Sequence, residues 1–166
     1  MEWLTPFRAS CNAARRRRVA DAVFRMNEAP VFLDADALVT RHLSADPLHA
    51  HARRVWSHLS ATRPPLITIA AHLEAAATQL ARAADPAFAA ERARRWQASQ
   101  ALQIIVPDDD DRRASFGWLE RWRDPGVDLA DCLAWAVMTR LRVVSAVTWR
   151  EPYRWAGFTL VPHAVR

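Results

Sequence analysis

The chain contains no lysine. All 23 basic residues among its 166 are arginines, and the formal net charge is +5. A guanidinium forms two parallel hydrogen bonds to a phosphate or carboxylate, and it keeps its proton inside proteins. Reactions that need a lysine side chain as a neutral base or Schiff-base partner are therefore excluded. The excess positive charge is typical of a solvated basic face, which also suits a polyanionic substrate.

Cysteine is nearly absent as well. Cys11 and Cys132 are the two cysteines, and their spacing fits neither a zinc site nor a disulfide framework. No apolar run approaches the roughly 18 residues that a membrane span needs. The arginine cluster at 15–18 is not followed by the apolar core of a secretory signal. We therefore expect a cytoplasmic protein without a membrane partner, in which Cys132 is a small buried side chain.

Glycine is the third scarce residue, with 3 in the chain, while hydrophobic residues make up 51%. This composition is typical of a globular protein and excludes a disordered one. The length predicts a single domain with a sizeable core. We expect residues 1–29 to be a basic N-terminal extension, helical or partly disordered, and residues 30–166 to form the domain.

Five short apolar segments have the length of buried strands, and helical patterns separate them. The expected strands are 31–33, 66–69, 103–106, 143–147 and 158–161, and the expected helices are 36–42, 47–61, 70–83, 86–101, 108–124 and 128–141. Strands that alternate with helices form a parallel sheet covered on both faces. The sequence therefore predicts an α/β fold, a three-layer α/β/α sandwich with a mainly parallel sheet of four to five strands.

Three acidic residues stand where apolar segments give way to helices. Asp34 directly follows the strand at 31–33, Glu74 lies about one helical turn after the strand at 66–69, and Asp131 opens a helix. Because the carboxyl ends of parallel strands meet at one edge of a sheet, these carboxylates are expected to converge. Carboxylate oxygens are the ligands that hard divalent cations prefer.

Other polar residues have simpler explanations. Asp36 suits the cap of the helix at 36–42, and Asp128 suits the cap of the helix at 128–141. The acidic run at 108–111 is typical of a helix N-terminus, where the helix dipole favours negative charge. None of the six histidines stands in a metal-ligand pattern.

Four segments, in this order, resemble the PIN-domain ribonucleases, and most closely the VapC-type toxins of toxin–antitoxin modules. Residues 31–38 resemble the opening strand and first acid of that family, and residues 66–74 its second strand and second acid. Residues 128–138 resemble the helix of the third acid, and residues 156–162 the terminal strand. Each motif alone is weak, but four in the right order, with the right elements between them, are fairly specific.

The resemblance implies a function and a site. Asp34, Glu74 and Asp131 would be catalytic and would ligate Mg²⁺ or Mn²⁺, with Asp128 as a further candidate ligand and Asp36 as an accessory residue. It implies hydrolysis of RNA phosphodiester bonds by the toxin of a type II pair. The implied partners are the RNA substrate, a small antitoxin protein and a second copy of the chain in a homodimer.

The chain departs from the family at one position. The family has a fourth acid after its fourth strand, in a pattern of Thr, an aromatic residue and Asp. Here Thr148 and Trp149 are followed by Arg150, which places a cation beside the expected cage. Glu151 stands one residue further on and is a candidate substitute. Thr148, Arg150 and Glu151 are therefore accessory candidates.

Three alternatives compete with this function, and the second and third fit the sequence poorly. Arg150 is compatible with a catalytically degenerate PIN-like module that binds RNA or protein. The motif Asp34-Ala35-Asp36 also resembles the paired aspartates of haloacid-dehalogenase-type phosphatases, but those enzymes generally hold the phosphate with a lysine, which this chain lacks. A phospho-receiver domain fails for the same reason.

Overall fold

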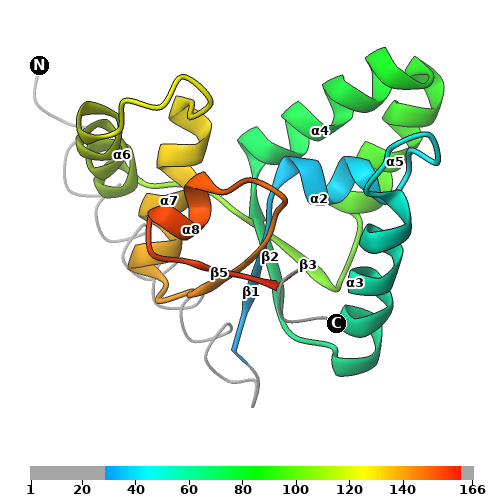
Figure 1. Cartoon of the computed structure of the whole chain (residues 1–166), viewed down its shortest axis with the longest axis horizontal. Coiled ribbons are helices and arrows are strands. Elements are labelled where there is room, and N and C mark those ends of the chain that lie inside the picture. The colour runs from blue at the N-terminus through cyan, green and yellow to red at the C-terminus, as the bar shows by residue number, and fades with distance from the viewer. Residues whose placement is uncertain (1–28, 162–166) are drawn as a thin grey trace, which may run out of the picture.

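A computed structural model of the chain describes residues 29–161. Its centre is a parallel sheet with the strand order β3-β2-β1-β4-β5 (Figure 1). The strands are β1 (Val31–Leu33), β2 (Leu66–Ile69), β3 (Leu102–Ile105), β4 (Ser145–Val147) and β5 (Thr159–Leu160). The predicted α/β fold with a parallel sheet is confirmed, and β5 lies at an edge as expected.

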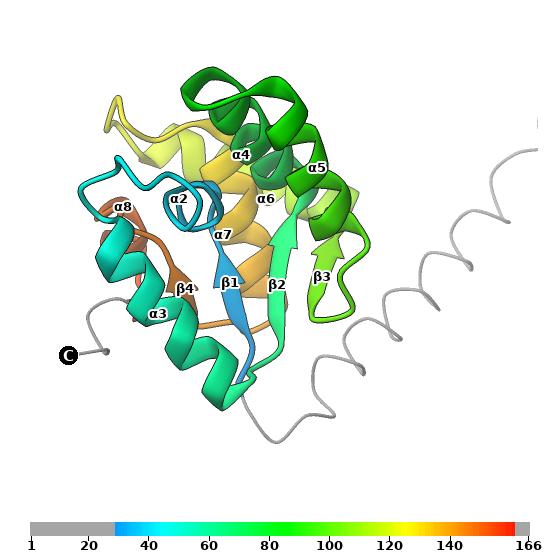
Figure 2. The same cartoon turned by 90° about the vertical axis from the view of Figure 1, so that its right-hand side faces the viewer.

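Helices cover both faces of this sheet (Figure 2). They are α2 (Ala35–Thr40), α3 (His49–Thr62), α4 (Ala70–Ala83), α5 (Pro86–Gln97), α6 (Asp109–Arg121), α7 (Leu129–Arg140) and α8 (Pro152–Trp155). None of the helices in residues 29–161 is long and apolar enough to cross a bilayer.

The two faces of the sheet carry separate cores. In β1, Phe32 belongs to the core under α7, where Trp135 and Tyr153 are fully buried. Its neighbours Val31 and Leu33 belong to the core under α2, α3, α4 and α5. Successive side chains of a strand point to opposite faces, so this alternation produces the three layers that the sequence predicts.

The strand order places the site. The chain runs outward from β1 through β2 to β3, and then returns to add β4 on the other side of β1. In parallel α/β sheets, ligands bind outside the carboxyl ends of the strands at such a reversal. Asp34 follows β1 and Thr148 follows β4, so the reversal brings together two residues that lie far apart in the sequence.

The sequence misplaced some boundaries. The helix expected to reach residue 101 ends at Gln97, and the helix expected to reach residue 124 ends at Arg121. The short helix α8 was not expected at all; Pro152 stands in its first turn, where the ring is compatible with a helix. The expected N-terminal extension falls almost wholly on residues 1–28, outside the described residues.

His42, just after α2, gives the fold a pH dependence. Its ring lies 6.0 Å from those of Phe88 and Trp96 on α5. Burial, with the positive charges of Arg41 and Arg92, lowers the pKa of His42 to about 4. The unfolded chain takes up this proton near pH 6.5. The contribution of the neutral His42 ring to the free energy of unfolding is therefore complete above that pH and is lost as the pH falls toward 4.

We expect His42→Gln to lose less stability than the wild type when the pH is lowered. Between about pH 7.5 and 4.5 the free energy of unfolding of the wild type should fall by about 1–2 kcal/mol more than that of the variant, a value reduced because the ring is only half-buried. Urea unfolding at the two pH values measures this. His58→Gln, which changes an exposed histidine of α3, should behave like the wild type. Equal losses in wild type and His42→Gln would refute the assignment.

Candidate metal centre

Asp34 stands at the carboxyl end of β1 and caps α2. One of its carboxylate oxygens accepts a hydrogen bond from the Ala35 N–H at 2.7 Å, and the other accepts one from the Thr148 hydroxyl at 2.8 Å. The sequence assigned this cap to Asp36, which was wrong. The backbone of Asp34 is extended, with φ −77° and ψ 163°, whereas Asp36 is already inside the helix. Asp34 therefore both caps α2 and lies beside Asp131 and His72.

Asp36 occupies the first turn of α2 and faces the segment after β4. Its Oδ2 accepts hydrogen bonds from the Trp149 N–H at 2.8 Å and the Thr148 hydroxyl at 3.2 Å. Its Oδ1 is buried and has no hydrogen-bond partner. Burial and the charge of Asp34 raise the pKa of Asp36 well above its usual value. This carboxyl therefore keeps its proton to a higher pH than an ordinary aspartate does.

Asp131 is presented by the first turn of α7. Asp128 caps that helix and accepts from the Asp131 N–H at 2.9 Å, while Asp131 Oδ2 accepts from the Asp128 N–H at 3.0 Å. This reciprocal capping box fixes the Asp131 side chain. The Asp131 side chain is 2% exposed. Asp128 is exposed and is not grouped with Asp34, His72 and Asp131.

Arg150 is bound to Asp131 through both ends of its guanidinium. Nη1 donates to Oδ1 at 2.5 Å, and Nη2 donates to Oδ2 at 2.8 Å and to the Gly126 carbonyl. Burial opposes the charge, but these bonds and the charge of Asp131 raise the pKa of Arg150. Arg150 thus occupies the place where the resemblance calls for a fourth acid, and its charge neutralises Asp131.

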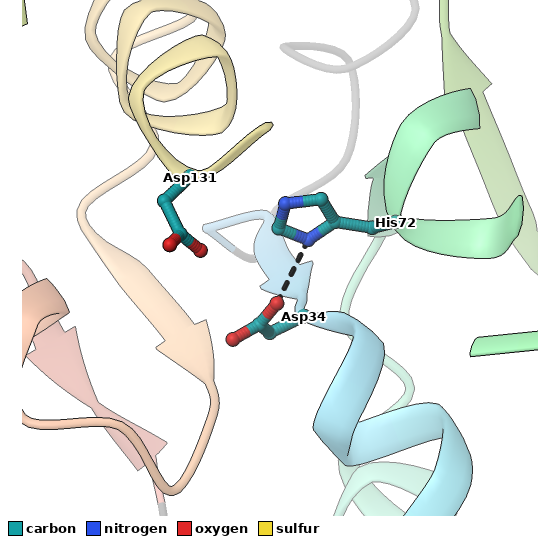
Figure 3. Close-up of side chains that lie close together, drawn as sticks. All are labelled: Asp34, His72 and Asp131. Atoms are coloured by element: carbon teal, nitrogen blue, oxygen red, sulfur yellow. Dashed lines mark ion pairs between the residues drawn. The ribbon is translucent and has the colours of Figure 1, made fainter. Parts of the chain in front are cut away.

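His72, which the sequence did not single out, lies close to Asp34 and Asp131, and these three residues form a buried cluster. The Nδ1 of His72 lies 2.8 Å from Asp34 Oδ1 (Figure 3), and its Nε2 lies 3.3 Å from the Ala130 carbonyl. Burial opposes protonation, but the charge of Asp34 raises the pKa of His72. When protonated, the ring pairs with the Asp34 carboxylate as a cation, and when neutral it could offer a ring nitrogen to a metal ion.

Glu74 lies outside this cluster. It is exposed on α4, whose buried positions include His72, Leu73, Ala76 and Leu80. Two residues correspond to about 200° around a helix, so Glu74 points away when His72 points inward. Glu151 is also outside: its side chain is 44% exposed and pairs with Arg154 at 3.5 Å. The apolar pattern of α4 places position 72 at the border of its buried face, which is the signal that the sequence offered for His72.

The donor set fits a hard divalent cation. One ligand atom from each of Asp34, His72 and Asp131 lies within 4.8 Å of the others, and the carboxylates come from two sides of one point (Figure 3). The unpartnered Asp36 Oδ1 and the buried, unpartnered Tyr153 hydroxyl supply further oxygen atoms nearby. Asp34 and Asp131 would hold the ion, and Arg150 would have to leave Asp131 for it to enter.

Comparison with known proteins is limited to structure. No protein-family model and no curated protein matches the chain. Its structure is similar to that of VapC20 from Mycobacterium tuberculosis, a toxin that cleaves the sarcin-ricin loop, with 23% identity and a TM-score of 0.69. The match covers 78% of this chain and 96% of that one. At this level of identity the likeness shows the fold, and the PIN-like fold predicted from the sequence is confirmed.

Proposed function

We propose that this chain is a Mg²⁺- or Mn²⁺-dependent endoribonuclease and the toxin of a type II toxin–antitoxin pair. The observation that carries the proposal is the buried cluster of Asp34 and Asp131 at the reversal point of the sheet. Burial of two carboxylates at less than 3% exposure costs free energy, and buried titratable groups of this kind are concentrated at functional sites. The fold that the chain shares with a ribonucleolytic toxin supports the same function.

The metal would supply the hydrolytic chemistry, because a bound divalent ion lowers the pKa of a water ligand and neutralises a leaving oxygen. The residues of the chain would position it. Asp34 is held by the Ala35 amide and the Thr148 hydroxyl, and Asp131 by the capping box with Asp128. Glu74 remains a candidate from the sequence alone, and its exposed position gives it no support as a ligand.

Arg150 favours a second candidate function. Its bidentate pair with Asp131 and the contact of His72 with Asp34 neutralise both carboxylates without a metal. Such a centre is compatible with a catalytically degenerate module that binds RNA or protein. The primary proposal differs in one respect: it requires Arg150 to release Asp131 when metal or phosphate binds.

The proposal includes the partners that accompany such a toxin. The substrate is RNA, a small antitoxin restrains the activity, and the chain forms a homodimer in the cytoplasm. Exposed apolar side chains on α6, Phe116 at 52% and Leu119 at 40% exposure, support a protein-binding surface there.

The direct test is cleavage of a structured RNA that includes a ribosomal sarcin-ricin loop, with Mn²⁺ and then with excess EDTA. We expect strand breaks with Mn²⁺ and none with EDTA, together with Mn²⁺ binding in calorimetry. Binding of Mn²⁺ without cleavage of any RNA would exclude the nuclease. A folded protein that binds no Mn²⁺ would favour the degenerate module.

A further inference from the structure

A basic cavity lies beyond the end of α2 that points away from Asp34. Its volume is about 400 Å³, and it lies beside the first three turns of α3. We call it the α3 pocket. Its lining residues are Arg41, His49, Arg53, Trp56, Ser57 and Ser60. None of the six is acidic, and the two arginines and Ser57 carry polar hydrogens that can be donated, whereas the Trp56 N–H and the Ser60 hydroxyl already donate to backbone carbonyls.

The pocket follows from the sequence of α3. Residues 49, 53, 56, 57 and 60 recur at three- and four-residue steps, which places them along one face of the helix. The opposite face carries Val55 and Leu59 into the core. No acidic residue stands in the first turn of α3, and no side chain caps it, so the positive end of the helix dipole adds to the charge of the pocket.

The positive charge of the pocket is not balanced by carboxylates. Within residues 29–161, no carboxylate lies in ion-pair distance of Arg41 or Arg53, whereas Arg92, Arg140 and Arg150 all have such partners. Burial, and then the charge of Arg92, lower the pKa of Arg41, so Arg92 contributes further positive charge to this region. An anion would satisfy a charge that the described residues leave open.

Arg41 is already held in place for such a ligand. Its guanidinium lies 4.3 Å from the centre of the Trp56 ring, and the Trp56 N–H donates to the Ala37 carbonyl at 3.2 Å. The indole is thus fixed to α2, and stacking orients the guanidinium on it. Because a stacked guanidinium keeps the N–H groups at its edge free, Arg41 can still bind two oxygens of one anion.

Hydrogen bonds connect the pocket to the candidate metal centre. The Trp149 N–H donates to Asp36, its indole N–H donates to the Thr40 hydroxyl at 3.2 Å, and His49 Nδ1 lies 2.9 Å from the Thr40 carbonyl. Asp34 and Arg41 stand at the two ends of α2, which has six residues and is therefore about 9 Å long. A single nucleic-acid strand covers such a distance in a few nucleotides.

We propose that the α3 pocket binds a backbone phosphate of the RNA strand whose scissile phosphate lies at Asp34 and Asp131. This inference rests on the proposed function, since it names a second contact for the same substrate. A phosphodiester offers oxygens in several directions to guanidinium and hydroxyl donors, whereas a carboxylate offers two in one plane. The pocket would fix the register of the strand and carry no preference for base sequence.

The test measures binding of RNA without cleavage. The probe is a 12-nucleotide single-stranded RNA with a fluorescent label, and fluorescence anisotropy is recorded in EDTA at several salt concentrations. The double variant Arg41→Gln/Arg53→Gln is compared with Arg82→Gln/Arg94→Gln. The control removes the same charge from exposed arginines of α4 and α5 that are outside the pocket. Thermal unfolding of both variants checks that each is folded.

We expect the pocket variant to bind about tenfold more weakly and the control within about twofold of the wild type. The slope of log affinity against log salt should decrease by about 0.7 for each phosphate contact that is lost. An equal loss of RNA affinity in both double variants would show that only the overall positive charge matters, and it would overturn the inference. The inference would also be overturned if a 12-residue oligoglutamate bound the wild type more tightly than the RNA does and if this binding depended on Arg41 and Arg53.

This experiment separates the pocket from the nuclease. Because the probe is bound in EDTA, a wild type that never cleaves RNA still reveals whether the pocket contacts phosphate. Pocket-dependent binding in EDTA, combined with no RNA cleavage in the separate Mn²⁺ assay, would support the pocket and exclude the nuclease. Mn²⁺-dependent cleavage by the wild type, with the pocket variant binding and cleaving like the control, would overturn the pocket alone.

Discussion

Asp34→Asn is expected to reduce Mn²⁺-dependent RNA cleavage by about 1000-fold or more. Such a loss corresponds to about 4 kcal/mol of transition-state stabilisation, which lies within the contribution of a metal that loses an essential ligand. Asparagine caps a helix as well as aspartate does, so α2 should begin at the same residue. Cleavage rates under single-turnover conditions, with Mn²⁺ binding by calorimetry, measure the effect.

Two further variants sharpen this result. Asp109→Asn makes the same chemical change at an exposed position of α6, and its rate should stay within about twofold of the wild type. Glu74→Gln tests the remaining candidate from the sequence. Since Glu74 is exposed and outside the cluster, we expect a loss of less than about threefold. A loss as large as that of Asp34→Asn would show that Glu74 reaches the metal in the active state.

Arg150→Gln is expected to change metal affinity and stability in opposite directions. The substitution removes the positive charge that Arg150 places beside Asp131. The Kd for Mn²⁺ should therefore fall by about tenfold or more, equivalent to about 1.4 kcal/mol. In EDTA the same change leaves a buried carboxylate unpaired. The free energy of unfolding should fall by about 1–3 kcal/mol, less than for a fully buried pair, because Arg150 is 32% exposed. Calorimetry and urea unfolding measure the two effects.

The control for Arg150 is Arg154→Gln. Arg154 is 47% exposed and pairs with Glu151, so its loss should alter neither Mn²⁺ affinity nor stability by more than about 0.5 kcal/mol. Unchanged or weaker Mn²⁺ binding by Arg150→Gln would contradict competition between guanidinium and metal. Arg150→Asp then separates the two candidate functions. Cleavage that is absent in the wild type and present in Arg150→Asp would identify a degenerate centre.

Much of the fold was predictable because its signals are local. The apolar segments that became β1 and β2 were found at their observed bounds, since buried parallel strands are short apolar runs. Asp108 and Asp128 were expected at helix starts and do cap α6 and α7. These patterns need only neighbours within one turn. Helix ends such as Gln97 were missed, because packing between elements decides where the last turn stops.

The candidate site was only partly predictable, because side-chain direction is not a local property. The sequence predicted that Asp34 and Asp131 converge, and the structure brings them together, but the sequence chose Glu74 where the structure presents His72. Both stand in the same turn of α4, and which of them faces inward depends on the rotation of that helix against the sheet. That rotation is set by the burial of Leu73, Ala76 and Leu80.

The sequence by itself determined the order along the chain of the five strands and of the helices other than α8, the absence of lysine chemistry and the presence of carboxylates at strand ends. Each of these depends on residue type and on spacing within a few positions. The tertiary structure alone decided that Thr148 donates to Asp34 across 114 residues and that Arg150 neutralises Asp131. Such contacts depend on how β4 packs beside β1, and this packing is a property of the assembled sheet.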